Sequence, residues 1–459
     1  MTGNVISRAV SIGTGIILAR LLSPADYGTF TVALVALVLI ANVNDLGLEP
    51  TIVRWPGDLS RVAPTAMTLI FGSSCLLFGF MFLLAPAFAS ALNASSAVGV
   101  VRLLAFGVVI GGAFAVPSAL LTRSFRQGRR TVADVTGLAV TTGLTILLAV
   151  RGFGPWSLAW GRVVGNAVNS ILHFLLAPAR YRPGWDPEIA RQLLRGSLPL
   201  AGTSLVAVAA LNVDYMIVGR VLGPASLGFY LLAFNLSSWP VNMFSTAVAQ
   251  VSVPAFARLQ DNLGDLQLAF RRALRLLLAV SVPVAALVAA LALPVVRFVY
   301  GARWAPAAAP LGFLALLGAI RVALQLVSDL LVATGRGHST LKLQLLWLGL
   351  LAPGLAIGAD VGGIRGVAIA HLFVAGAFMV PAFLFALRQL RIGVRDLASA
   401  AALPLAGALG ASVAASVAIT FVDGDIRQLA VGGVVGVLTY GIVLAPSGRT
   451  LLNSVRPAP

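Results

Sequence analysis

Charged side chains within long apolar segments are the residues of this sequence that can do chemistry. Each such charge costs about 2.5–3.5 kcal/mol on membrane-insertion scales, so it usually faces a cavity and serves a function. Arginine suits phosphate groups, because its planar fork binds their oxygens bidentately and stays charged in apolar surroundings. The pattern therefore predicts a polar cavity, with the candidate binding residues Arg8, Asp45, Glu49, Arg162, Asp214 and Arg321.

Three titratable residues in apolar segments have alternative interpretations. Asp214 lies six residues before Arg220, nearly two helical turns away, so a direct pair between them cannot be assumed. Asp214 is then a counter-ion to an arginine on another helix, a cation-coupling site or part of a buried structural pair. His173 and His371 either relay protons or hydrogen-bond a neighbouring helix.

Composition places these charges in a membrane protein. Of the 459 residues, 59% are hydrophobic and 10% are charged, and the mean hydropathy is +0.97. Apolar blocks long enough to cross a core of about 30 Å recur along the chain. They predict an all-α protein with fourteen spans, near residues 4–22, 29–50, 62–91, 97–121, 131–150, 155–177, 198–221, 226–254, 274–299, 308–333, 340–359, 363–387, 398–420 and 428–446.

The basic residues predict the orientation of these spans. Arginine and lysine concentrate in alternate connections, with 22 on the side of the N-terminus and seven on the other side. By the positive-inside rule, both termini are expected in the cytoplasm of a cell whose inner membrane holds the protein. The inner stretches 178–197 and 255–273 are amphipathic and suit helices lying on anionic lipid.

An internal repeat divides the chain. Residues 17–30 read ILARLLSPADYGTF and residues 217–230 read IVGRVLGPASLGFY, with six identities at a spacing of two hundred. Six predicted spans separate the copies, so both run in the same direction, as in transporters built from parallel repeats. The expected organisation is an N-lobe at 1–185, a C-lobe at 186–390, and two additional helices with a cytoplasmic tail at 391–459.

Several protein classes are excluded by the same sequence. The net charge of +17 comes with no basic patch interleaved with base-reading side chains, so nucleic acid is not an expected partner. The single cysteine, Cys75, excludes disulfides within the chain and cysteine-based metal sites. No phosphate-binding GxxxxGK[ST] motif occurs. No catalytic residue, metal or cofactor is predicted.

Seven segments, spread in order over most of the chain, resemble a known family. They are ILARLLSPADYG, NDLGLEPTIVR, PSALLTRSFR, VRGFGPWSLAWGRVV, NVDYMIVGRVLGPASLGFY, VPAFARLQDN and FVYGARWAPAAAPL. Together they resemble Wzx-type polysaccharide flippases of the multidrug, oligosaccharidyl-lipid and polysaccharide exporter superfamily, in the branch for colanic acid and succinoglycan export. The Glu49-Pro50 pair departs from that pattern, since small or amide residues are common there.

The resemblance implies two six-helix lobes plus two helices, and export of an oligosaccharide linked to a lipid of the undecaprenyl diphosphate type. It implies passage from the inner to the outer leaflet by alternating access, and membrane lipids, a polysaccharide polymerase and glycosyltransferases as partners. In the related lipid II flippases, the arginine matching Arg8 lines the central cavity. Arg8 is therefore the first candidate for the head group, and anchoring at the inner surface is its alternative role.

Two other functions are compatible with the sequence. A drug or cation antiporter of the same superfamily would require an acidic cavity without an excess of arginine. A membrane glycosyltransferase or glycan polymerase would require a large outer loop with catalytic carboxylates, whereas all predicted connections are short.

Overall fold

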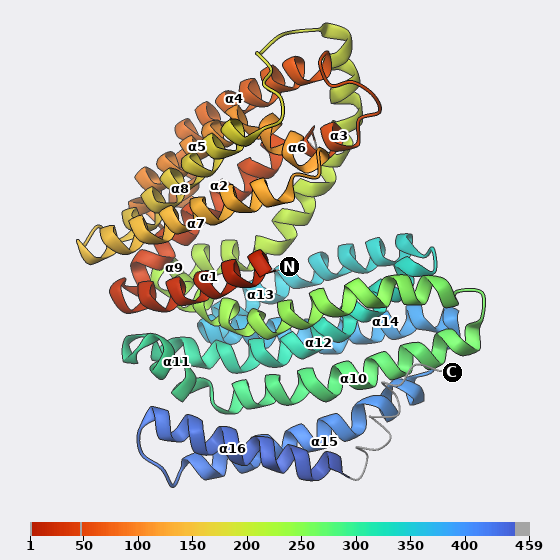
Figure 1. Cartoon of the computed structure of the whole chain (residues 1–459). Coiled ribbons are helices and arrows are strands. Elements are labelled where there is room, and N and C mark those ends of the chain that lie inside the picture. The colour runs from red at the N-terminus through yellow and green to blue at the C-terminus, as the bar shows by residue number, and fades with distance from the viewer. Residues whose placement is uncertain (1, 46–47, 446–459) are drawn as a thin grey trace. The chain divides into compact units, whose positions relative to one another are not determined.

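The computed structural model describes residues 2–45 and 48–445, and this part of the chain is helical without strands (Figure 1). It divides into two compact units, Met1–Gly228 and Phe229–Pro459. The expected all-α architecture of many apolar helices is confirmed.

The first unit is a bundle in which α2, α4, α5, α7 and α8 pack side by side. Its α7 and α8 approach closely because small residues face each other. A Cβ atom on Gly161 would lie 1.8 Å from the Thr145 hydroxyl, and one on Gly165 would lie 1.8 Å from that of Thr141. The helices are α1 (Thr2–Leu21), α2 (Pro24–Asp45), α3 (Leu48–Arg54), α4 (Val62–Ala91), α5 (Val98–Ala113), α6 (Ala115–Arg123), α7 (Gln127–Val150), α8 (Pro155–Leu176) and the first part of α9 (Pro187–Leu259).

The second unit contains a similar bundle and a terminal helix pair. Its helices after α9 are α10 (Leu263–Ala290), α11 (Ala292–Tyr300), α12 (Ala308–Ala333), α13 (Gly337–Phe373), α14 (Val380–Leu387), α15 (Val394–Ile419) and α16 (Asp425–Leu444). The last two pack on each other, and both contact α10. The Tyr440 hydroxyl of α16 donates to the Ala279 carbonyl of α10 at 2.6 Å.

Ten segments of the described chain are long and apolar enough to cross a membrane. Asn212–Trp239 covers parts of two predicted spans, and His338–Leu390 covers two predicted spans completely. Each contains glycines with non-helical backbone angles, Gly223 in the first and Gly362 and Gly363 in the second. The N-terminal span appears as a shorter apolar helix, and α8 falls outside the ten. The ten segments are thus consistent with fourteen spans, and that number stays a prediction.

Two local conformations recur in both units at spacings near two hundred. Phe125 after α6 and Gly335 after α12 both have positive φ angles, 54° and 74°. In each turn, the N–H of the following residue donates to a carbonyl five residues earlier, at 3.1 and 2.8 Å. Gly154 before α8 and Gly363 within α13 share φ angles of 53° and 56°. The duplication therefore extends beyond the repeat at residues 17–30.

The boundary between the units differs from the predicted lobe boundary. Helix contacts divide the chain after Gly228, whereas the prediction places the N-lobe at 1–185 and the C-lobe at 186–390. The predicted lobe boundaries come from the sequence repeat and not from packing within each unit, and they stay a prediction. The prediction of separate surface helices at 178–197 and 255–273 is wrong, because α9 runs from Pro187 to Leu259 and α10 starts four residues later.

Candidate functional site

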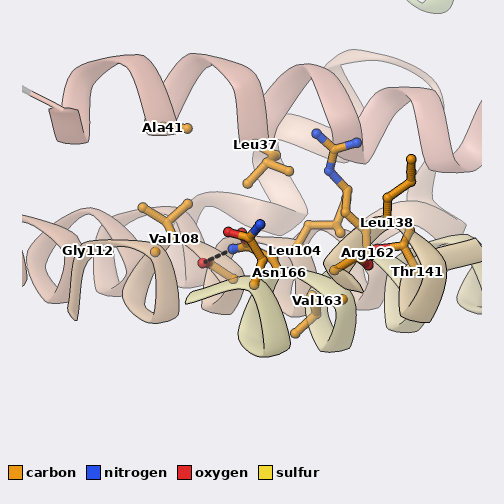
Figure 2. Close-up of a pocket in the computed structure, with 15 residues that line it drawn as sticks. Leu37, Ala41, Leu104, Val108, Gly112, Leu138, Thr141, Arg162, Val163 and Asn166 are labelled. Carbon is orange, nitrogen blue, oxygen red and sulfur yellow. Dashed lines mark hydrogen bonds between the residues drawn. The ribbon is translucent and has the colours of Figure 1, made fainter. Parts of the chain in front are cut away.

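A cavity of about 510 Å³ lies inside the first unit, between α2, α5, α7 and α8 (Figure 2). Its volume is within the range of small-molecule sites, about 300–1,000 Å³. Its lining is Leu37, Ala41, Leu104, Gly107, Val108, Gly111, Gly112, Gly137, Leu138, Thr141, Arg162, Val163, Gly165, Asn166 and Asn169. Among the side chains that the structure describes here, arginine is the only charged type in the lining, and none is acidic.

Arg162 supplies the positive charge of the cavity. Figure 2 shows its guanidinium extending from α8 toward α2, near Leu37. Among the side chains that the structure describes, none forms a hydrogen bond or an ion pair with it. The side chain is exposed, so its donors are available to an anionic ligand that enters the cavity.

Five glycines line the cavity. Gly107, Gly111 and Gly112 lie on α5, and two more lie on α7 and α8. A Cβ atom on Gly111 would lie 3.8 Å from the Asn166 side-chain nitrogen. Larger residues on this face of α5 would therefore occupy the space beside the polar face of α8.

Two asparagines continue the polar face of α8. Arg162, Asn166 and Asn169 follow a spacing of four and then three residues, which places them on one side of the helix. The Asn166 Nδ2 donates to the carbonyl of Gly107 at 3.3 Å. The Asn169 Nδ2 donates to Oδ1 of Asp134 on α7 at 2.9 Å.

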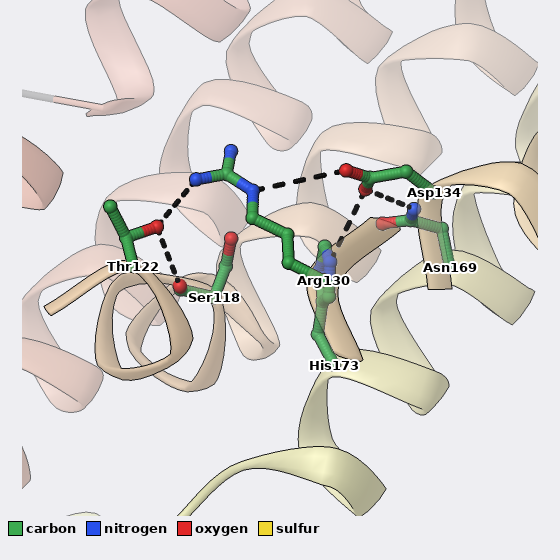
Figure 3. Close-up of polar contacts among 6 residues, drawn as sticks. All are labelled: Ser118, Thr122, Arg130, Asp134, Asn169 and His173. Atoms are coloured by element: carbon green, nitrogen blue, oxygen red, sulfur yellow. Dashed lines mark hydrogen bonds and ion pairs between the residues drawn. The ribbon is translucent and has the colours of Figure 1, made fainter. Parts of the chain in front are cut away.

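Asp134 is the centre of a charged cluster next to this polar face (Figure 3). Its Oδ1, which accepts from Asn169, is also 3.3 Å from Nε2 of His173. Its Oδ2 lies 3.8 Å from Nε of Arg130. Arg130 also donates to the Thr122 hydroxyl, so the cluster connects α6, α7 and α8.

Two basic residues of the second unit, Arg321 and His371, match cavity-lining positions of the first unit in the repeat. His371 lies eight residues after Gly363, as Arg162 lies eight residues after Gly154. Counted from the turns described above, Arg321 on α12 takes the place of Gly111 on α5. Each unit thus carries a basic side chain at one or both of these matched positions.

Aromatic rings surround these second-unit residues. The Arg321 Cζ is 5.6 Å from the centre of the Phe234 ring, a cation–π distance. The His371 imidazole is buried and 5.7 Å from the Trp347 ring. Arg321 is therefore held against an aromatic face, unlike Arg162.

The second unit also has an apolar pocket of about 470 Å³ between α10, α12, α14 and α15. Its lining consists of leucine, valine, isoleucine, alanine and phenylalanine side chains. Because these described side chains offer no polar group, the pocket suits hydrocarbon rather than a charged head group.

The structure brings one predicted site residue, Arg162, into the described cavity. The side chains of Arg8, Asp45 and Glu49 lie outside the part that the structure describes. Asp214 is buried on α9, where its Oδ1 accepts from the Tyr215 N–H at 2.9 Å, and it does not line the cavity. The sequence analysis missed Asn166 and Asn169, although their helical spacing from Arg162 was a usable signal.

Comparison with known proteins agrees with this architecture. A family model described as polysaccharide biosynthesis protein matches residues 17–309. The chain is 25% identical over 382 residues to the lipopolysaccharide biosynthesis protein WzxC of Escherichia coli, covering 80% of this chain and 76% of WzxC. It is also 25% identical over 349 residues to the succinoglycan biosynthesis transport protein ExoT of Rhizobium meliloti, covering 76% of this chain and 69% of ExoT.

The fold is similar to a solved transporter structure. The lipid II flippase MurJ, in an inward closed conformation, superposes with a TM-score of 0.79 and 14% identity, covering 98% of this chain and 99% of MurJ. This similarity shows the fold, and the family match confirms the resemblance found in the sequence. The chain is a multi-span membrane protein that belongs to the polysaccharide biosynthesis protein family.

Proposed function

We propose that this protein is a flippase that moves a lipid-linked oligosaccharide from the inner to the outer leaflet of the plasma membrane by alternating access. The observation that carries the proposal is Arg162, whose guanidinium faces a cavity without a partner among the described side chains. A diphosphate provides oxygens that a guanidinium binds bidentately. The cavity needs to shield only this head, since the long tail can stay in lipid.

The relatives support this class of substrate. ExoT is a transport protein of succinoglycan biosynthesis, WzxC acts in lipopolysaccharide biosynthesis, and MurJ is a lipid II flippase. A carrier lipid of the undecaprenyl diphosphate type is the proposed anchor of the oligosaccharide. Glycosyltransferases that build this lipid and a polymerase that consumes it are the proposed partners.

The remaining predicted residues keep their proposed roles. Arg8, Asp45 and Glu49 on α1 to α3, Asp214 on α9 and Arg321 on α12 are candidates for contact with the head group or for its charge balance. Both termini are proposed to lie in the cytoplasm, as the distribution of arginine predicts.

A drug or cation antiporter is less well supported by the cavity. Such a protein would bind a cation through acidic side chains, whereas the described lining contains an arginine and no carboxylate. The positive charge of Arg162 would repel a cationic substrate inside the cavity.

Complementation of a gene-deletion strain tests the proposal. The strain should lose its surface glycan and accumulate lipid-linked units in the inner leaflet, and wild-type protein should restore export. Arg162→Ala should fail to restore it at equal protein level, and Arg162→Lys should restore it only in part, because an ammonium lacks the bidentate fork.

Arg102→Ala is the matched control. Arg102 belongs to the same unit, but its Nε donates to the Phe82 carbonyl and its Cζ lies 4.4 Å from the centre of the Phe82 ring, outside the cavity. It should restore export fully. Full export with Arg162→Ala, or normal glycan display in the deletion strain, would refute the proposal.

A further inference from the structure

The polar face of α8 offers more than a phosphate site. Asn166 and Asn169 line the same cavity as Arg162 and lie four and seven residues beyond it. At 1.5 Å of rise per residue they are about 6 and about 10 Å from Arg162 along the helix axis. The first sugar rings on a diphosphate bound at Arg162 would come within reach of these amides if they extended along α8.

The carboxamide groups are oriented for contact with hydroxyls. Each Nδ2 is anchored by one hydrogen bond, Asn166 to the Gly107 carbonyl at 3.3 Å and Asn169 to Asp134 at 2.9 Å. Among the described residues, no donor reaches either Oδ1. Each amide therefore has a free acceptor and a second N–H, which matches a sugar hydroxyl that donates and accepts.

Both amides are held by close contacts with neighbouring helices. The backbone of α5 touches Asn166, since the Gly107 carbonyl accepts its Nδ2 hydrogen bond at 3.3 Å. A Cβ atom on Gly137 of α7 would lie 2.7 Å from that of Asn169, so the backbone of α7 also approaches this residue closely. Asn169 is thereby held in place by its surroundings.

Asp134 fixes the orientation of Asn169 without lining the cavity itself. Its Oδ1 accepts the Asn169 hydrogen bond, while Arg130 and His173 lie against its two oxygens at 3.8 and 3.3 Å (Figure 3). Replacing this acceptor would free the Asn169 amide to rotate. Asp134 thus acts through Asn169.

We propose that Asn166 and Asn169 bind the sugars next to the diphosphate and discriminate among lipid-linked glycans, with Asp134 as the positioning residue for Asn169. This inference rests on the proposed function, because it assumes a diphosphate at Arg162. It assigns the class of ligand for this face of α8, namely a neutral, hydroxyl-bearing pyranose.

Binding of three short probes to the purified protein tests the inference. The probes are farnesyl diphosphate and the same molecule carrying one glucose or one galactose. Wild-type protein should bind at least one sugar-bearing probe about three- to tenfold more tightly than the bare diphosphate, as one or two net hydrogen bonds would give. Equal affinity for all three probes would overturn the inference.

Substitutions separate the sugar site from the phosphate site. Asn166→Leu and Asn169→Leu should remove the preference for sugar and leave affinity for farnesyl diphosphate unchanged. An equal loss for bare and sugar-bearing probes would show that these asparagines only support the fold. Arg162→Ala should lose all three probes; if it retains bare diphosphate, the phosphate site of the proposed function is wrong instead.

Further variants test the role of Asp134. Asp134→Asn keeps an oxygen that accepts from Asn169 and should retain the sugar preference, whereas Asp134→Leu should lose it while still binding bare diphosphate. The same preference in Asp134→Leu as in wild-type protein would overturn the positioning role. Ser170→Ala, at the next position on α8 and outside the lining, is the control and should change neither affinity.

Discussion

Gly28 lies directly against the backbone of Pro224, so that a Cβ atom on Gly28 would be 1.6 Å from the Pro224 carbonyl oxygen. The duplicated residues make the reciprocal contact, since a Cβ atom on Gly228 would be 2.1 Å from the carbonyl oxygen of Pro24. The two copies of the Pro-Ala-x-x-Gly turn therefore meet through glycine within the first unit. Their identity at a spacing of two hundred has a steric reason.

Gly28→Ala should destabilise the protein. The added methyl group meets backbone rather than a flexible side chain, so the helices must separate, and overpacking of this kind costs about 1–3 kcal/mol. Thermal unfolding in detergent should show a lower Tm. Gly72→Ala is the control, because a Cβ atom at Gly72 on α4 meets nothing within 4 Å and alanine favours the helix. An unchanged Tm for Gly28→Ala would contradict the close contact.

Arg123→Ala should also lower stability, through a different contact. Arg123 ends α6 and donates to three carbonyls in and just after α3: Nη1 to Ile52 and Trp55 at 3.2 and 2.6 Å, and Nη2 to Gly57 at 2.7 Å. Hydrogen bonds from a charged donor contribute about 1.5–3 kcal/mol, less where water reaches them.

Thermal unfolding again provides the measurement. Arg123→Lys should recover only part of the loss, because one ammonium cannot reach all three carbonyls. The exposed neighbour Arg129 is the control, and Arg129→Ala should leave the Tm unchanged. Equal Tm values for Arg123→Ala and Arg129→Ala would show that the three carbonyls do not depend on this side chain.

Cysteine labelling tests the proposed orientation. In a Cys75→Ala background, Ser95→Cys after α4 should react with a membrane-impermeant maleimide in intact cells, and Ser124→Cys after α6 should react only after lysis. Both serines are exposed in short connections between helices. The reverse pattern would place the arginine-rich connections outside and contradict cytoplasmic termini.

The helices were predictable because apolar blocks separated by proline, glycine and arginine leave few alternatives in a membrane. Connections were harder to predict. Span seven and span eight join at Gly223 without a loop, so α9 extends over both, and the amphipathic stretch before it is part of the same helix. Amphipathic residues at 178–197 fit a helix on a lipid surface as well as the end of a long helix, and composition does not distinguish these.

The cavity was only partly predictable. Charge within an apolar segment singled out Arg162, because such a charge usually faces a cavity. The same criterion passes over Asn166 and Asn169, since uncharged amides are common in membrane helices. The glycines of α5 can be identified as cavity residues only once the packing of α5 against α8 is known. Arg321 met the same criterion as Arg162, yet it packs on Phe234 and is absent from the cavity lining.

Translocation in proteoliposomes tests the central claim most directly. Purified protein is reconstituted into vesicles that contain a fluorescent polyprenyl-diphosphate-linked sugar, and a membrane-impermeant reductant reports how much label reaches the outer leaflet over time. Wild-type protein and Arg102→Ala should move the labelled lipid at similar rates, and Arg162→Ala at least about tenfold more slowly, as loss of a charge-assisted bidentate contact predicts. Equal rates for Arg162→Ala and wild-type protein, or no movement above that in protein-free vesicles, would contradict the account.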